Sequence, residues 1–311
     1  MRQSLVRRAY KYRFYPTQEQ ELHLLRTFGC VRLVYNKALE ARTSAWQLER
    51  KRVNYAETSA LLTLWKKQSD LAFLNEVSSV PLQQALRHLQ SAFTSFFTKR
   101  SNYPRTKSRK RSRQSAEYTR SAFRWRDGKL TLAKMREPLN VVWSRPLPEG
   151  ASPSTVTVSC DTAGRWFVSI LVEARLEHLP LTDAVVGVDM GVESFVALST
   201  GEKVANLRFE RQERVCLARA QRELSRKERG SRNYVKACRE VARVHARTKD
   251  RRRDYLHKLS TRLVRENQTI VIEDLNVQGM RHDRDVNAAK NILAAGLAVV
   301  ACGGGVRPSR P

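Results

Sequence analysis

The sequence predicts an α+β protein of more than one domain, in which a helical block interrupts a small β-barrel and an α/β unit follows. Residues 5–15 and 121–175 contain short apolar strands separated by turns, whereas residues 18–99 repeat apolar residues every three or four positions. After Pro180, apolar strands alternate with long helical segments. If the first strand closes the barrel, the helical block is an insertion into it.

The amino-terminal strand should be followed directly by helices. Pro16 ends the strand, and Thr17 is a good helix N-cap with Glu19 and Glu21 in the first turn. From there to Lys99 the length allows about three or four helices. The apolar stripe of the first helix should contain Leu22, Leu25, Phe28, Val31, Leu33, Val34 and Leu39.

The α/β unit should contain three strands, a helical hairpin and a final helix. The expected elements are strands at Val185–Val188, Phe195–Leu198 and Thr269–Glu273, a hairpin over 208–265 and a helix at Val286–Ala298. The expected organisation is a first barrel strand at 1–17, a helical insertion with a basic arm at 18–114, the rest of the barrel at 115–180, the α/β domain at 181–302 and a flexible tail at 303–311.

Positive charge dominates the composition. There are 58 Lys and Arg residues against 30 Asp and Glu, a net charge of +28. Such a charge repels itself in the folded state unless a polyanion neutralises it, and nucleic acid fits because phosphate contacts release counterions. Ribosomal or histone-like structural proteins share this property. A membrane surface fits less well, because no apolar run approaches about 18 residues.

Two basic segments are the expected contacts with nucleic acid. Eight of the fifteen residues from Lys99 to Arg113 are Lys or Arg, which fits a solvated linker or a binding arm. The overall charge favours the binding arm. The second arm of the helical hairpin is also strongly basic. The residues expected to bind nucleic acid are Lys107, Arg109, Lys110, Arg111, Arg251, Arg252 and Arg253.

The five cysteines form no metal or disulfide pattern. They are odd in number and widely spaced, and no two are arranged as Cys-x-x-Cys. This argues against a disulfide framework and against a zinc ribbon, so zinc is not expected. Reduced buried thiols and the lack of an apolar signal-peptide core in residues 1–17 indicate a cytoplasmic protein.

Three acidic residues lie at positions where burial makes an ionised carboxylate energetically costly unless a ligand compensates its charge. Asp189 follows the apolar strand Val185–Val188, Glu273 ends the strand from Thr269, and Asp285 opens the last helix. Each alone could be a surface residue, and Asp285 could simply cap its helix. Buried together, carboxylates repel each other unless divalent metal neutralises them. Mg²⁺ or Mn²⁺ could then activate water for attack on a phosphodiester.

Several sequence blocks together resemble the TnpB family, the accessory proteins of small insertion sequences and relatives of compact type V CRISPR nucleases. The blocks span nearly the whole chain: YKYRFYPTQEQ…VYNKAL, SVPLQQALRHLQSAFTSFF, VGVDMGV…ALSTGE, HKLSTRLVRENQTIVIEDLNVQGM and HDRDVNAAKNILAAGLAV. The resemblance implies a barrel-like wedge domain with a helical recognition insertion, then a RuvC nuclease domain of RNase H-like fold. It also implies a guide RNA, a target DNA with a short adjacent motif, and an insertion-sequence transposase as genetic partner.

The resemblance assigns roles to individual residues. The positions that match the family's metal-binding catalytic triad are Asp189, Glu273 and Asp285. The alternative for the third ligand is Asp283. The positions that fall where the family reads the target-adjacent motif are Tyr55, Ser59 and Gln83.

The chain departs from the family pattern in one segment. In the family, further RuvC structure, a lid over the active site and a four-cysteine zinc ribbon separate NVQGM from HDRD. Here Met280 is followed almost directly by His282, and only eleven residues lie between Glu273 and Asp285. An extended segment of that length reaches about 33 Å, so the two carboxylates can still meet. The nuclease domain is therefore expected to be shortened.

Three functions fit these observations. The triad favours an RNA-guided DNA endonuclease. The shortened domain favours an RNA-guided DNA-binding protein or repressor that does not cut. A guide-free RuvC-like resolvase of branched DNA fits least, because it does not account for the helical insertion and the basic arm.

Overall fold

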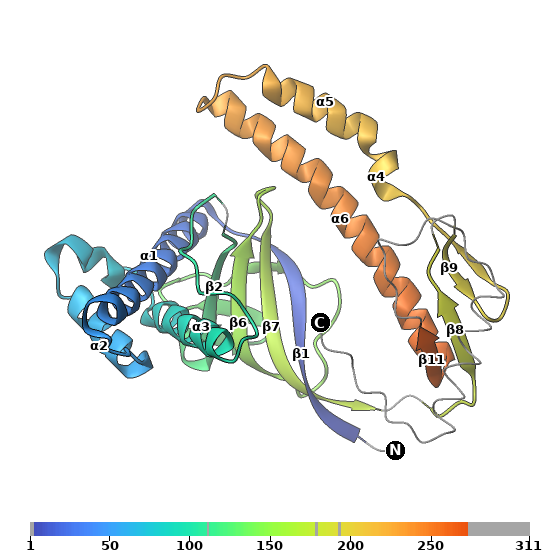
Figure 1. Cartoon of the computed structure of the whole chain (residues 1–311), viewed down its shortest axis with the longest axis horizontal. Coiled ribbons are helices and arrows are strands. Elements are labelled where there is room, and N and C mark those ends of the chain that lie inside the picture. The colour runs from blue at the N-terminus through green and yellow to red at the C-terminus, as the bar shows by residue number, and fades with distance from the viewer. Residues whose placement is uncertain (1–2, 111, 178–179, 192–193, 273–311) are drawn as a thin grey trace. The chain divides into compact units, whose positions relative to one another are not determined.

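The computed structural model describes residues 3–110, 112–177, 180–191 and 194–272. The chain divides into two compact units, residues 1–177 and 178–311, close to the boundary expected at residue 180 (Figure 1). Glu273, the expected helix Val286–Ala298 and the expected tail at 303–311 lie outside the described residues. The chain is α and β in both units.

The first unit is built on a five-stranded antiparallel sheet (Figure 1). In sheet order, its strands are β2 (Gln114–Thr119), β6 (Ser152–Cys160), β7 (Trp166–Glu177), β1 (Gln3–Tyr15) and β5 (Asn140–Val142). The expected first strand is therefore present, and it lies inside the sheet between β7 and β5. A separate hairpin joins β3 (Phe123–Arg126) to β4 (Lys129–Leu132). Its turn is Asp127–Gly128, whose φ angles of 50° and 70° suit a tight two-residue hairpin loop.

A helical block lies between β1 and β2 in the chain. It consists of α1 (Gln18–Glu49), α2 (Tyr55–Trp65), the 3₁₀ helix Ser69–Asn75 and α3 (Ser79–Phe97). These helices therefore lie, in chain order, between two strands of the same sheet. α1 begins with a capping box, in which the Thr17 hydroxyl accepts from the Gln20 amide and the Gln20 side chain accepts from the Thr17 amide.

The core of the first unit lies between the sheet and α1. Phe14 of β1 is fully buried and packs edge-on against Trp166 of β7, with ring centroids 5.9 Å apart. Trp166 in turn stacks on Phe28 of α1, with centroids 5.8 Å apart. These three rings therefore join the two central strands to the longest helix of the insertion.

The apolar stripe expected on α1 is partly confirmed. Its buried members are Phe28, Val31, Val34 and Leu39. The stripe was wrong at Leu22 and Leu25, whose side chains are 59% and 41% exposed. Leu24 is fully buried instead. Leu22 precedes Leu24 by two residues, about 200° around the helix, so the two side chains must face in nearly opposite directions.

The second unit combines a mixed sheet with a long helical hairpin (Figure 1). In sheet order, its described strands are β10 (Lys203–Ala205), β9 (Ser194–Leu198), β8 (Val185–Asp189) and β11 (Thr269–Ile272). β8, β9 and β10 are antiparallel, whereas β11 runs parallel to β8. Parallel strands need a long crossover. The crossover contains α4 (Phe209–Gln212), α5 (Arg214–Ser225) and α6 (Arg232–Glu266).

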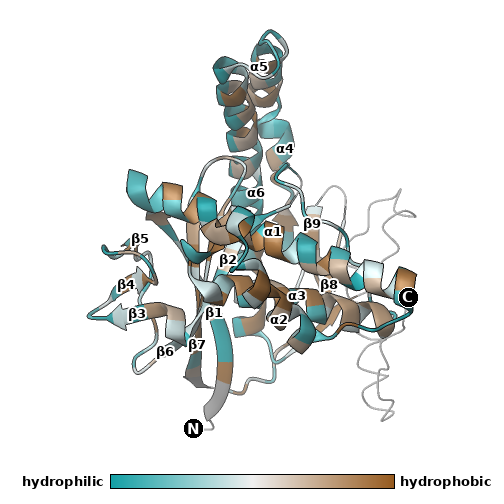
Figure 2. Ribbon diagram, turned by 90° about the vertical axis from the view of Figure 1, so that its left-hand side faces the viewer, coloured by the Kyte–Doolittle hydropathy of each residue, from teal (hydrophilic) through white to brown (hydrophobic). Residues whose placement is uncertain are grey.

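The hairpin of α5 and α6 has little core of its own. No residue of α5 is buried, and the buried residues of α6 are Leu259 and Leu263, which pack on the valines of β8 and β9. Figure 2 shows hydrophilic and hydrophobic residues mixed along α5 and the adjoining turns of α6. Within the described part of the chain, no helix is both long enough and apolar enough to cross a membrane.

Candidate nucleic-acid interface and carboxylate site

Asp189 is the last residue of β8, and its side chain is fully buried. It pairs with Ala197 of β9 on one side of the strand. On the other side, Val188 is opposite Ile272 of β11, and Glu273 is the next residue in the sequence. Of the expected triad and its alternative, the structure describes Asp189; Glu273, Asp283 and Asp285 lie outside the described residues.

The position of Asp189 suits a ligand site. Open α/β sheets bind ligands beyond the carboxyl ends of their strands, and Asp189 stands at such an end, beside a parallel neighbour. A buried ionised carboxylate is costly without a compensating charge. Its oxygens are hard donors of the kind that Mg²⁺ and Mn²⁺ prefer. Among the described residues, no three His, Cys, Asp or Glu side chains are grouped so as to hold a metal ion.

The three residues expected to read a target-adjacent motif lie on neighbouring turns of α2 and α3. Tyr55 and Ser59 are one turn apart on α2, and Gln83 is one turn from Arg87 on α3. The Arg87 guanidinium lies 5.3 Å from the Tyr55 ring centroid, which links the two helices at this point. Gln83 is exposed, whereas Tyr55 and Ser59 are half-buried. The contact between Arg87 and Tyr55 was not predicted from the sequence.

The basic arm after α3 has two kinds of cation. The Lys107 backbone exchanges two hydrogen bonds with the Asn36 side chain, and its ammonium lies 3.9 Å from the Tyr35 ring centroid. Burial lowers the pKa of Lys107 below its ordinary value. Arg109 and Lys110 are exposed, and the remaining expected contact, Arg111, lies outside the described residues. Lys107 therefore anchors the arm to α1, while its two neighbours face solvent.

Replacing Lys107 by alanine should lower the stability of the first unit and leave nucleic-acid affinity nearly unchanged. The expected loss is about 1 kcal/mol, because the variant removes a cation–π contact and the packing of the lysine stem on Tyr35. Thermal unfolding and binding titrations measure the two effects. The matched control is the double change Arg109→Ala, Lys110→Ala, which should weaken binding and flatten its salt dependence without altering stability. A greater loss of affinity in the Lys107 variant than in the control contradicts this assignment.

The three arginines of α6 that are expected to contact nucleic acid also differ in their ion pairs. Arg251 donates to Glu213 at 2.7 Å, and Arg252 donates to Glu210 at 2.9 Å. The Glu213 side chain is only 8% exposed and also accepts from Arg247 at 3.5 Å. These ion pairs hold α6 against α4 and against the N-cap residue of α5. Arg253 is exposed on α6.

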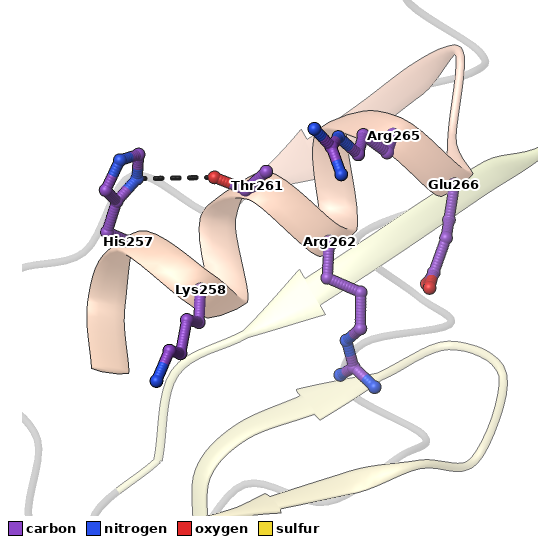
Figure 3. Close-up of a pocket in the computed structure, with 6 residues that line it drawn as sticks. All are labelled: His257, Lys258, Thr261, Arg262, Arg265 and Glu266. Atoms are coloured by element: carbon purple, nitrogen blue, oxygen red, sulfur yellow. Dashed lines mark hydrogen bonds between the residues drawn. The ribbon is translucent and has the colours of Figure 1, made fainter. Parts of the chain in front are cut away.

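A pocket of about 470 Å³ lies along the carboxyl-terminal turns of α6 (Figure 3). Its lining residues are His257, Lys258, Thr261, Arg262, Arg265 and Glu266. The Thr261 hydroxyl lies 3.2 Å from His257 Nδ1, and Arg262 donates to Glu202 at 2.7 Å. The hydrogen bond to Glu202 raises the pKa of Arg262. Lys258 likewise pairs with Asp254 at 2.7 Å, so two of the three lysine and arginine side chains in the lining already have a carboxylate partner.

Two family models match the chain. A model of OrfB from IS605 elements, described as "Probable transposase", matches residues 167–284, and one described as "Helix-turn-helix domain" matches residues 1–51. In the structure, residues 1–51 contain the strand β1 and the single helix α1 rather than two helices joined by a turn. The first match covers β8 to β11 and therefore includes Asp189.

Curated relatives decide the family. A protein from Streptomyces pristinaespiralis named "Putative RNA-guided DNA endonuclease" is 56% identical, over 98% of this chain and 93% of its own length. The chain belongs to the TnpB family. InsQ of Escherichia coli K12 has the same descriptive name and is 33% identical, over 88% of this chain and 67% of the relative. The resemblance to TnpB found in the sequence blocks is confirmed.

Length distinguishes this chain from its TnpB relatives. The alignment with the Streptomyces relative spans 374 positions whereas the chain has 311 residues, so at least 63 positions of the relative have no counterpart here. Among solved structures, a Cas12f1–sgRNA–target DNA complex matches at 11% identity with a TM-score of 0.49, over 94% of this chain and 87% of that one.

Proposed function

We propose that the protein is an RNA-guided DNA endonuclease of the TnpB type, which uses a guide RNA to select its target DNA. The observation that supports this most strongly is 56% identity to a relative with that name across 98% of the chain. A net charge of +28 suits a protein that holds RNA and DNA together. The genetic partner in this proposal is the transposase of an insertion sequence.

In this proposal, the first unit is the wedge domain and α1 to α3 are its recognition insertion. The insertion of these helices between β1 and β2 of one sheet supports the assignment. The second unit is then a RuvC-like nuclease domain. Its support is the mixed sheet, in which a helical crossover brings β11 parallel to β8 and leaves Asp189 at a strand end.

The proposed catalytic residues are Asp189, Glu273 and Asp285, with Asp283 as the alternative third ligand. These carboxylates would hold Mg²⁺ or Mn²⁺, and zinc has no part in the proposal. The bound metal would supply a water activated for attack and charge stabilisation at the leaving oxygen. The chain's own contribution is a rigid position for the Asp189 carboxylate at the end of a paired, buried strand.

The proposed reader of the target-adjacent motif is the surface of Tyr55, Ser59 and Gln83, to which we add Arg87. Amide and guanidinium side chains such as those of Gln83 and Arg87 suit hydrogen bonds to base edges. The contact between Arg87 and the Tyr55 ring supports a shared surface of α2 and α3. The proposed backbone contacts are Arg109, Lys110 and Arg253, whose side chains are exposed.

A second function is a guided DNA-binding protein or repressor that does not cut. The observation in its favour is the absence of counterparts for at least 63 aligned positions of the Streptomyces relative. A binder of this kind needs the same RNA and DNA surfaces as the endonuclease. The two functions therefore differ in whether the proposed metal site at Asp189 cuts the bound DNA.

Purified protein should contain an RNA of defined end sequence. The basic arm and α6 expose enough Arg and Lys side chains to retain RNA through purification at low salt. Sequencing of the RNA that copurifies with the full chain measures this. Recovery of random cellular RNA fragments would count against a guide and therefore against both guided functions.

A further inference from the structure

The ends of α1 and α3 present exposed aromatic rings that the proposed function does not use. Trp46, Phe97 and Tyr103 are 44%, 63% and 43% exposed. The Arg52 guanidinium lies between the first two, 5.9 Å from the Trp46 ring centroid and 6.0 Å from that of Phe97. Arg50 places a second guanidinium 5.7 Å from Trp46. These five residues are called the ring patch below.

Neighbouring side chains hold Phe97 and Tyr103 of the ring patch in place. Phe97 stacks on the buried Phe93, with centroids 6.1 Å apart and planes at 26°. Tyr103 lies edge-on to Phe93 at 5.5 Å, and its hydroxyl is 2.8 Å from that of Thr43. The Arg42 guanidinium covers Phe93 at 4.1 Å. Rings fixed in this way lose little conformational freedom when a flat ligand stacks on them.

The positive charge around the ring patch favours nucleic acid over a second copy of the chain as its partner. Lys51, Lys99 and Arg100 are exposed next to the two helix ends, and Lys51 lies 3.7 Å from Glu57. A second copy of the chain would set the same arginines against one another on proteins of net charge +28. A strand of nucleic acid instead offers flat bases to the rings and phosphates to the cations.

Unpaired RNA fits the ring patch better than duplex DNA. Bases in the interior of a duplex are stacked on each other and covered on both faces, so they offer no free face to an exposed ring. Folded RNA keeps unpaired bases in its loops and ends, and proteins bind them by stacking on aromatic rings and guanidinium planes. Both kinds of group are present in the patch.

We propose that the ring patch stacks unpaired nucleotides of the bound RNA, with bases on Trp46 and Phe97 and phosphates at Arg50 and Arg52. This inference rests on the RNA binding proposed above. Its residues are different from those proposed to read the target-adjacent motif. Stacking needs no particular base, so the patch should bind RNA with little sequence preference.

The test is the double variant Trp46→Ala, Phe97→Ala in the full chain. Its affinity for a short single-stranded RNA should fall about tenfold, whereas its affinity for blunt duplex RNA should not change. The ring-preserving variant Trp46→Phe should keep most of the affinity. The matched control is Leu48→Ala, because Leu48 is 83% exposed at the same helix end and has no ring. Thermal unfolding checks that each variant is folded.

Several outcomes would overturn the proposal. Equal losses on single-stranded and duplex RNA would assign the effect to charge or folding, and a larger loss on single-stranded DNA than on RNA would assign the patch to DNA. Loss of a dimer in the double variant, seen by sedimentation, would assign it to a second copy. If the wild-type protein binds no RNA, the proposed function falls as well. If the wild type binds RNA and the double variant binds it equally, this inference falls alone.

Discussion

Replacement of Asp189 by asparagine is expected to reduce metal-dependent DNA cleavage to background while guide RNA binding stays unchanged. Asparagine keeps the size of the side chain at a fully buried position, so the fold should survive. It removes the negative charge that would hold Mg²⁺ or Mn²⁺ at the end of β8. Cleavage of labelled target DNA and binding of labelled RNA measure the two effects on one preparation.

Matched variants locate the other ligands. Glu273→Gln and Asp285→Asn should abolish cleavage as Asp189→Asn does, because loss of any ligand unseats the metal. Loss of activity in Asp283→Asn with Asp285→Asn still active would show that Asp283 is the third ligand. Undiminished cleavage by Asp189→Asn would refute the proposed site. If the wild type and every variant bind guided DNA equally and none cuts it, the chain is a binder.

Replacement of Phe14 by alanine should cost the first unit about 3–5 kcal/mol of stability, as is typical of phenylalanine deletions in a core. Phe14 is fully buried and packs on Trp166, which stacks on Phe28 of α1. The change therefore loosens the contact between the central strands and the helical insertion. Thermal or urea unfolding monitored by circular dichroism measures the loss.

The adjacent residue supplies the control for Phe14. Tyr15 is 56% exposed on the opposite face of β1, where its ring lies 5.5 Å from the Arg13 guanidinium. Tyr15→Ala should cost less than about 1 kcal/mol, because it opens no cavity and breaks only an exposed cation–π contact. Similar losses for the two variants would show that the core does not lie on the Phe14 face.

Local sequence patterns predicted the elements of this fold well. Alternating apolar residues predicted the strands, and apolar residues repeated every three or four positions predicted the helices. These patterns, like the Thr17 cap and the helical hairpin, depend on residues close together in the chain, so the sequence alone contains the information. The stripe on α1 failed at Leu22, because α1 is apolar on more than one side and only contact with the sheet decides which leucines are buried.

The contacts of individual basic side chains could not be predicted from the sequence, because their partners lie far away in the chain. Lys107 looked like its basic neighbours, but its ammonium packs on Tyr35, 72 positions earlier. Arg251 and Arg252, which are predicted phosphate contacts, pair with Glu213 and Glu210, and the sequence did not predict these ion pairs. The burial of Asp189 could be predicted, because the apolar run before it indicates a buried strand. The other two expected ligands, Glu273 and Asp285, lie outside the described residues.

The most direct test of the guided function is to change the guide. The protein is loaded with its copurified RNA, in which the guide segment has been replaced by a new sequence, and its binding to matched and unmatched DNA is measured. We expect DNA binding to move to the new matching sequence and to depend on a fixed motif beside it, whether or not the DNA is cut. Binding that ignores the guide, or that follows branched DNA structure without RNA, would contradict a guided function.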